Sequence, residues 1–369
     1  MAAASTLRIG VNALYLIPGA VGGTEIYLRC LLQALAAIDR DNHYVVFTNR
    51  ETGSGLAPDH ANFTVEQQPV HARSRPARIL WEQTGLPLRV AARGLDVLWN
   101  PGFTAPLLCG CPQVTVFHDM QHKRHPEHFR WFDLPFWRLL LYWSAHLSTR
   151  LIAVSSATRD DLLRYYRLPA TVVWSGVDSR FFGIRHAAQY YFLAVSTLHP
   201  HKNLDGLLRA FAQFRKTHPE FRLIVAGLRG FQTAELEQLR LSLDLAEAVE
   251  FTGWVTREML YRLYAGAFAF LYPTTFEGFG LPLLEALAAG LPAACSRIEP
   301  LTTLADDAAL FIEPGSDAAI LESMTALATD ADLRGRLAAA GPPRAAQFSW
   351  EASARATLQV LGQAARQTI

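Results

Sequence analysis

The sequence predicts an α/β protein made of two doubly wound domains. Short apolar strands alternate with helical patterns in both halves of the chain, which is typical of parallel sheets covered by helices on both faces. The chain has 369 residues, of which 50% are apolar and 18% charged, and this length exceeds that of one typical domain. Ligands of such folds bind at the carboxyl ends of the strands, so we expect the functional residues there.

The expected strands are distributed over both halves. In the first half they cover residues 7–11, 44–48, 96–99, 113–117 and 151–154, with an amphipathic helix at about 24–38. In the second half they cover residues 191–196, 222–226, 249–252, 268–272 and 292–295. Glycines and polar residues interrupt this pattern between 177 and 190, so we place the two domains at residues 1–180 and 181–349.

The composition excludes several classes of protein. A net charge of +1 is far from that of a nucleic-acid-binding surface. The four cysteines, Cys30, Cys109, Cys111 and Cys295, form no metal-ligand pattern, and we expect reduced thiols in a cytosolic protein. Met1 to Thr6 include no basic segment ahead of an apolar one, which predicts no signal peptide, and no apolar run reaches the roughly 18 residues of a membrane span.

The stretch from Thr275 to Glu285, TFEGFGLPLLE, is the most informative part of the chain. An expected strand precedes it, and Pro282 suits the first turn of a helix, where a missing N–H costs nothing. The amides of residues 279–281 would then lie at a helix N-terminus, where the macrodipole favours a phosphate.

Two carboxylates, Glu277 and Glu285, flank this expected anion site. Carboxylates repel phosphate, so their partners should be hydroxyls on either side of it, as in a diphosphate with a sugar at each end. That chemistry describes a nucleotide sugar. The alternative is two ordinary surface glutamates, but Gly278 and Gly280 set among phenylalanines are unsuited to a plain surface turn and allow close approach of a ligand to the backbone.

Other residues are expected at the same cleft. Gly22-Gly23 opens the first helix, with Thr24 as a candidate cap, and either cradles a ligand or forms a plain loop. His118-Asp119 follows an expected strand, and this histidine is either structural or faces the cleft. In the loop from Ser196 to Asn203, Lys202 offers a compact positive charge to diphosphate oxygens; the alternative is a solvated lysine.

These motifs together resemble glycosyltransferase family 4, the group 1 retaining transferases of the GT-B fold, over essentially the whole chain. The resemblance implies two Rossmann-like domains facing a central cleft, an acceptor domain followed by a nucleotide-sugar donor domain. It also implies that residues from about 350 to 369 return to complete the first domain. The matching motifs are Gly22-Gly23, His118-Asp119, Lys202-Asn203, the E-x7-E element of Glu277 and Glu285, residues 307–314, and the closing segment from Phe348.

The resemblance also implies roles for these residues. Glu277 contacts the donor sugar, Glu285 the ribose, and His118 the reaction centre. Lys202 holds the diphosphate and stabilises it as it leaves, without a required metal or cofactor. The implied donor-binding set is Gly22, Gly23, Ser196, Thr197, Lys202, Glu277, Gly278, Phe279, Gly280, Leu281 and Glu285, with Asp119, His201, Asn203 and Arg229 in support.

Some positions depart from the family pattern. Many members carry arginine where Thr197 stands, and the loss of such a charge-assisted contact would cost about 1.5 to 3 kcal/mol unless His201 or Arg229 replaces it. The stretch Thr302-Thr303 replaces a familiar Pro-Glu, and Ser175 replaces a usual asparagine. These departures bear on donor identity and on activity, not on the fold.

The segment from residue 122 to 148 interleaves basic and aromatic residues. It suits a membrane surface, an acceptor groove or a buried helix pair, and the sequence favours none of them.

We therefore expect a cytoplasmic hexosyltransferase, with peripheral contact to the inner face of a membrane as an open alternative. The donor is GDP-mannose or a UDP-sugar. The acceptor is a glycan such as a growing polysaccharide, a lipid-linked glycan or a small molecule. Two other functions stay open: a nucleotide-sugar epimerase of the same fold, and a non-catalytic sugar-nucleotide-binding protein.

Overall fold

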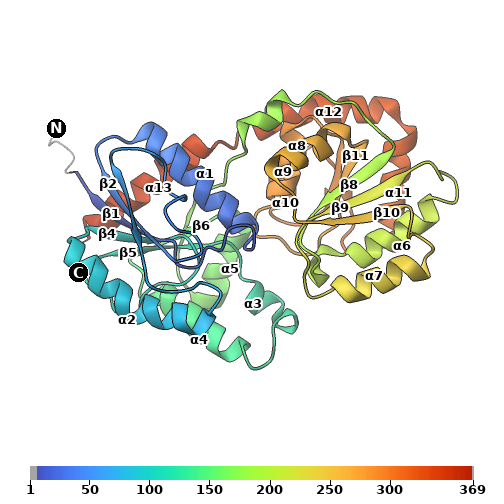
Figure 1. Cartoon of the computed structure of the whole chain (residues 1–369). Coiled ribbons are helices and arrows are strands. Elements are labelled where there is room, and N and C mark those ends of the chain that lie inside the picture. Colours follow the sequence, from blue (N-terminus) through green and yellow to red (C-terminus); the bar gives the residue numbers. More distant parts are fainter. Residues whose placement is uncertain (1–5, 368–369) are drawn as a thin grey trace. The chain divides into compact units, whose positions relative to one another are not determined.

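The computed structural model describes residues 6–367 and divides into two compact units (Figure 1, where the colours follow the sequence). The first unit takes in the described residues through Gly176 and those from Trp350 onward, and the second comprises Val177–Ser349. The expected absence of a leader at Met1 to Thr6 falls, apart from Thr6, outside the described residues.

A parallel sheet of seven strands forms the centre of the first unit within residues 6–367, in the order β3-β2-β1-β4-β5-β6-β7. The strands are β1 (Arg8–Asn12), β2 (His43–Thr48), β3 (Phe63–Gln67), β4 (Val97–Asn100), β5 (Gln113–Phe117), β6 (Arg150–Ala153) and β7 (Thr171–Val172). The helices are α1 (Gly23–Ile38), α2 (Arg75–Arg93), α3 (Gln121–Arg124), η1 (Pro126–His128), α4 (Leu134–His146), α5 (Ser156–Tyr166) and α13 (Trp350–Ala365).

The second unit repeats this plan with a six-stranded parallel sheet in the order β10-β9-β8-β11-β12-β13. Its strands are β8 (Tyr191–Val195), β9 (Arg222–Ala226), β10 (Val249–Gly253), β11 (Ala269–Tyr272), β12 (Ala293–Ser296) and β13 (Leu310–Ile312). Its helices are η2 (Ser179–Gly183), η3 (Pro200–Lys202), α6 (Leu204–Phe214), α7 (Thr233–Ser242), α8 (Arg257–Gly266), α9 (Leu281–Ala288), α10 (Leu301–Ala305), α11 (Asp317–Thr329) and α12 (Ala331–Ala345).

Both sheets reverse their winding direction at one point. In the first unit this point lies between β1 and β4, and in the second between β8 and β11. The chain segments that follow the two strands there run to opposite faces of the sheet, which leaves a crevice at the carboxyl ends of these strands. Ligands of doubly wound folds bind in this crevice. The fold therefore provides one such position in each unit.

All ten expected strands form, each within one residue of its predicted bounds. The prediction missed β3, β7 and β13, which lie at sheet edges. These edge strands are partly exposed or short. Strand β3 has no fully buried residue, and β7 has only two residues. They therefore lack the continuous apolar run that marks an interior parallel strand.

Helix α13 returns to the first unit, which confirms the expected crossing of the C-terminal helix. It packs against α1, where the rings of Tyr27 and Trp350 lie 5.9 Å apart. The Ser353 hydroxyl also donates to the carbonyl of Trp174. Among the described residues, no helix is both long and apolar enough to cross a bilayer.

Candidate functional site

The loops after β8 and β11 meet at the switch point of the second sheet. β8 and β11 are neighbours, so the ends of both strands lie side by side. The Thr275 amide donates to the carbonyl of His201 at 2.7 Å, and the Thr274 hydroxyl lies 2.8 Å from the same oxygen. These bonds join the two loops that the sequence analysis singled out.

Lys202 and Glu277 form an ion pair across these joined loops. The Lys202 ammonium donates to Oε1 of Glu277, and the two side chains are only 14% and 10% exposed. The Tyr272 ring lies 5.6 Å from the same ammonium, and its hydroxyl hydrogen-bonds to Glu277. The two residues expected to contact different parts of one ligand are thus brought together and paired with each other.

Glu285 is buried inside α9, with 4% of its surface exposed. Arg257 Nη1 donates to its Oε1 at 2.9 Å, and the Tyr264 hydroxyl donates to its Oε2 at 3.3 Å. Burial raises the pKa of Glu285, while the Arg257 guanidinium opposes that rise. Glu285 is therefore not the surface residue of the alternative interpretation.

Sequence reasoning missed Arg257, which lies on α8, 28 residues before Glu285. Its Nη2 also donates to Asp178 at 2.9 Å. Burial acts to raise the pKa of Asp178, but hydrogen bonds from Arg180, Tyr261 and Arg257 outweigh it and hold that pKa below its usual range. No local motif marks Arg257, so only the fold reveals it.

Helix α9 starts with Gly280 in the left-handed region, at φ 107°. The first intrahelical hydrogen bond joins the Leu284 amide to the Gly280 carbonyl at 3.2 Å, and Pro282 has no N–H to satisfy. The amides of Gly280 and Leu281 thus lie ahead of the bonded turn, as an anion site requires. Phe276 and Phe279 are buried, so the turn does not expose them.

The remaining predicted residues of this unit surround the same loops. The Ser196 amide donates to Ala226 at 2.9 Å, and its buried hydroxyl has no hydrogen-bond partner among residues 6–367. Thr197 and His201 are partly exposed, and Asn203 is the N-cap of α6 at φ 52°. Arg229 is exposed on the loop after β9.

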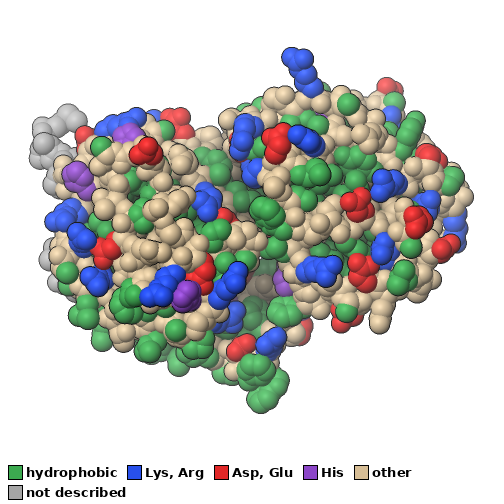
Figure 2. Space-filling model, in the orientation of Figure 1, with side chains coloured by type: hydrophobic (Ala, Val, Ile, Leu, Met, Phe, Trp, Pro, Cys, Tyr) green, Lys and Arg blue, Asp and Glu red, His purple; other side chains and the backbone are tan. Residues whose placement is uncertain are grey.

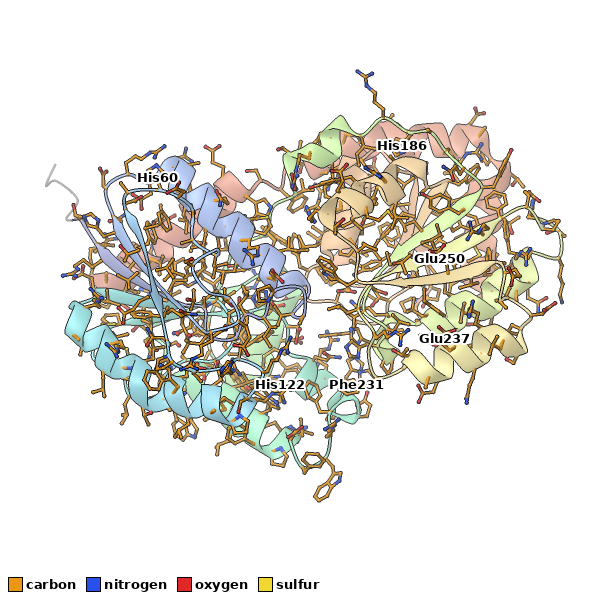
Figure 3. The ribbon with its side chains drawn as sticks, viewed as in Figure 1. His60, His122, His186, Phe231, Glu237 and Glu250 are labelled. Atoms are coloured by element: carbon orange, nitrogen blue, oxygen red, sulfur yellow. The ribbon has the colours of Figure 1, made fainter. Side chains whose placement is uncertain are left out.

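That loop also carries Phe231, labelled in Figure 3. Its ring lies 5.1 Å from the ring of His199, which itself lies 5.8 Å from that of His201. The loop after β9 is therefore packed against the loop after β8.

The other predicted residues belong to the first unit. Helix α1 begins at Gly23, and Gly22 is its N-cap at φ 61°, ψ −131°, a conformation that favours glycine. The prediction that Thr24 caps this helix is wrong, because Thr24 lies inside it and donates to the carbonyl of Val21 at 3.0 Å. Helix α1 therefore begins without a side-chain cap.

His118 follows β5, and its Nε2 lies 2.7 Å from the carbonyl of Pro101. Its ring lies 4.8 Å from that of Tyr27 and 5.1 Å from that of Phe103. Burial lowers the pKa of His118 to about 4, so the imidazole is neutral at pH 7. Nε2–H then donates to Pro101, and Nδ1 is left as an acceptor for a hydroxyl. Asp119 instead accepts the amide of Gln121 at 2.9 Å, at the start of α3.

The segment 122–148 has one buried and one exposed side. His122, labelled in Figure 3, is buried against Tyr166, while Leu140 and Leu141 of α4 face the core. Figure 2 shows hydrophobic side chains gathered along the edge of this unit that carries α2 and α4. The exposed large apolar residues of the segment, which we call the apolar stripe, are Trp131, Phe132, Phe136, Leu139, Tyr142, Trp143 and Leu147.

Within the described residues, His125, Glu127 and His128 form a group whose potential metal-ligand atoms lie within 4.8 Å of one another. Glu127 is exposed, and its Oε1 lies 3.0 Å from His125 Nδ1 and 4.0 Å from His128 Nε2. A surface cluster of two imidazoles and one carboxylate accounts for these contacts, and we assign no metal to them.

Comparison with known proteins gives a family for this architecture. A family model described as "Glycosyl transferases group 1" matches residues 179–344, and one described as "Glycosyltransferase Family 4" matches residues 21–181. O-antigen chain mannosyltransferase B of Escherichia coli is 32% identical over 254 residues, covering 64% of this chain and 67% of that protein. D-inositol 3-phosphate glycosyltransferase of Streptomyces scabiei is 31% identical, covering 93% and 86%.

Solved structures show the same fold. Anabaena HepE, in complex with UDP and glucose, matches with a TM-score of 0.74 at 19% identity, covering 97% of this chain and all of that chain. The two parallel-sheet domains are thus those of the GT-B architecture. The chain belongs to the group 1 glycosyltransferases.

Proposed function

We propose that this protein is a metal-independent, retaining hexosyltransferase of family 4 that uses a nucleotide-diphosphate sugar. The Lys202–Glu277 pair beside the N-terminus of α9 is the observation that carries this proposal. It places a cation, a carboxylate and backbone amides at one switch point, where a sugar diphosphate needs all three.

Each group then has a role in transfer. Glu277 binds hydroxyls of the donor sugar and Glu285, held by Arg257, binds those of the ribose. Lys202 and the amides of residues 279–281 hold the diphosphate and stabilise its charge as it leaves, which is the work a metal does in other transferases. His118 Nδ1 accepts a hydroxyl hydrogen from the sugar at the reaction centre.

The donor is GDP-mannose or a UDP-sugar. A relative named as a mannosyltransferase supports mannose, and the UDP and glucose in the HepE complex support a UDP-sugar. The relatives' names point to different acceptors, an O-antigen chain and inositol 3-phosphate. The acceptor class is a glycan, a lipid-linked glycan or a small molecule.

Nucleotide binding and transfer test the proposal together. The full chain is screened by thermal shift against GDP, UDP, ADP and their sugar conjugates. The nucleotides of one base should raise its melting temperature, because they bind only the native state. The sugar nucleotide that binds should then transfer to an added acceptor with its anomeric configuration kept, as read by NMR. Conversion of the sugar nucleotide without acceptor would indicate an epimerase, and binding without release of sugar a non-catalytic binder.

We further propose that the apolar stripe contacts a lipid surface. Trp131 is 84% exposed, Phe132 follows it, and the other members lie on α4 or directly after it. Arg124 and Arg130 are exposed shortly before the stripe in the sequence. Apolar residues flanked by arginines are complementary to anionic lipids. The full chain should sediment with phosphatidylglycerol vesicles but not with phosphatidylcholine vesicles, and Trp131→Ser/Phe136→Ser should abolish this. Equal sedimentation of the variant would refute the contact.

A further inference from the structure

The switch point of the first sheet contains a buried polar cluster that no role above explains. Asn12 ends β1 and Asn100 ends β4, and the Asn12 amide lies 3.0 Å from Asn100 Oδ1 and 3.3 Å from Oε1 of Glu82. Thr104 donates to Oε2 of Glu82 at 3.0 Å. The cluster lies where the topology places a ligand, in the position that Lys202 and Glu277 occupy in the second unit.

Arg78 belongs to this cluster, in the first turn of α2, and is only 7% exposed. Its guanidinium makes no hydrogen bond or ion pair among residues 6–367. Arg257, the buried arginine of the other switch point, has two carboxylate partners within 2.9 Å. Charges at such depth are normally paired, because removing them from water is costly.

The groups that face Arg78 do not satisfy it. Glu82 lies one turn further along α2 and attracts the Arg78 charge, but it forms no ion pair with it within 4.0 Å, and its oxygens accept from Asn12 and Thr104. Tyr15 is the other nearby group, and its hydroxyl lies 3.4 Å from the carbonyl of Thr24 in the first turn of α1. The neighbouring Tyr15 thus links Arg78 to the start of α1, and no described residue accepts a hydrogen bond from the Arg78 guanidinium.

We propose that Arg78 binds an oxyanion, a phosphate or a carboxylate, on the acceptor. This inference rests on the proposed function, in which the first domain holds the acceptor. A guanidinium fork matches two oxygens of either group, which would accept from donors that no described residue uses. A neutral sugar would offer single hydroxyl oxygens and no charge to this fork. The acceptor is then an anionic sugar or polyol rather than a neutral one.

Calorimetric binding to matched ligands tests this with the full chain. Glucose 6-phosphate and glucuronate carry the two oxyanions, glucose carries none, and inorganic phosphate carries no sugar. Wild type should bind one of the two anionic sugars at least tenfold more tightly than glucose and more tightly than inorganic phosphate. Arg78→Gln should lose at least tenfold in that affinity, and Arg78→Lys should retain part of it.

The matched control is Arg75→Gln, on the same helix turn, whose guanidinium lies over the Trp137 ring at 5.0 Å. It should change the affinity less than threefold. Unchanged affinity in folded Arg78→Gln, or a loss of nucleotide affinity instead, would overturn the proposal. GDP or UDP binding measured in the same samples reports separately on the proposed function, because Arg78 should not affect it.

Discussion

Arg257 Nη1 donates to Oε1 of Glu285 at 2.9 Å, so a carboxylate buried in α9 is held by a guanidinium of α8. The same guanidinium reaches Asp178, at the start of the second unit, through Nη2. One residue without a recognisable motif thus fixes the orientation of a motif residue. Because Glu285 is held in place before any ligand arrives, a ribose would meet an ordered acceptor.

Arg257→Gln should destabilise the protein by about 2 to 4 kcal/mol, because it leaves the buried carboxylate of Glu285 without its cation, whereas Asp178 keeps Arg180. Urea unfolding of the variant measures this. The control is Arg262→Gln on the same helix, whose pair with Glu258 at 3.7 Å is exposed and should be worth less than about 1 kcal/mol. Equal losses in both variants would contradict a structural role for the buried pair.

Lys202→Ala and Glu277→Gln should each lower transfer by roughly 100-fold while the protein stays folded. The two side chains form one pair, so the double variant should lose much less than the product of the single losses. Initial rates at saturating donor measure this, with Lys216→Ala as an exposed lysine control. Fully multiplicative losses would show that the two residues act separately.

Gly280→Ala should destabilise the second unit by about 1 to 3 kcal/mol, since φ 107° strains any side chain there. The new Cβ would also lie 2.5 Å from the Leu301 side chain. Gly315→Ala separates the backbone strain from the clash with Leu301, because Gly315 has φ 75° but open space around it. The Gly280 variant should be the less stable of the two in thermal unfolding and should bind nucleotide more weakly. Identical behaviour would mean that the contact with Leu301 has no effect.

The folding stability should fall as the pH drops from 6.5 toward 4. The His118 pKa is about 4 in the folded protein and near the ordinary histidine value of 6.5 in the unfolded chain, so in this window the unfolded state binds a proton that the folded state does not. Above pH 6.5 both states are neutral and the effect vanishes. The full loss from His118 is about 3 kcal/mol at pH 4.

The His122 pKa is also lowered to about 4, so His122 should contribute similarly. Urea unfolding at several pH values gives the free energy of unfolding as a function of pH. This free energy should change less steeply with pH in His118→Gln and in His122→Gln than in wild type, and least steeply in the double variant. If the free energy of unfolding of both single variants depended on pH as steeply as that of wild type, neither imidazole would stay neutral in the folded state.

Much of the fold could be predicted because interior strands of a parallel sheet are buried on both faces. Continuous apolar runs such as that of β11 are visible in the sequence, whereas β3, with half-exposed residues, is not. The site was predictable where glycines and a proline mark a helix start, as at Gly280 and Pro282. Arg257 was not predictable, because α8 lies far from α9 in the sequence and carries no local signal.

The sequence alone determined the two parallel sheets, the helix that opens at Leu281 and the carboxylates on either side of that helix start, because these depend on short-range periodicity and backbone chemistry. The tertiary structure decided how the charges are partnered. Lys202 and Glu277 meet across 75 residues, Arg257 binds Glu285, and the buried Arg78 donates no hydrogen bond to a described residue. Ion pairing depends on distances of a few ångströms between side chains from different elements, and only the packed fold sets those distances.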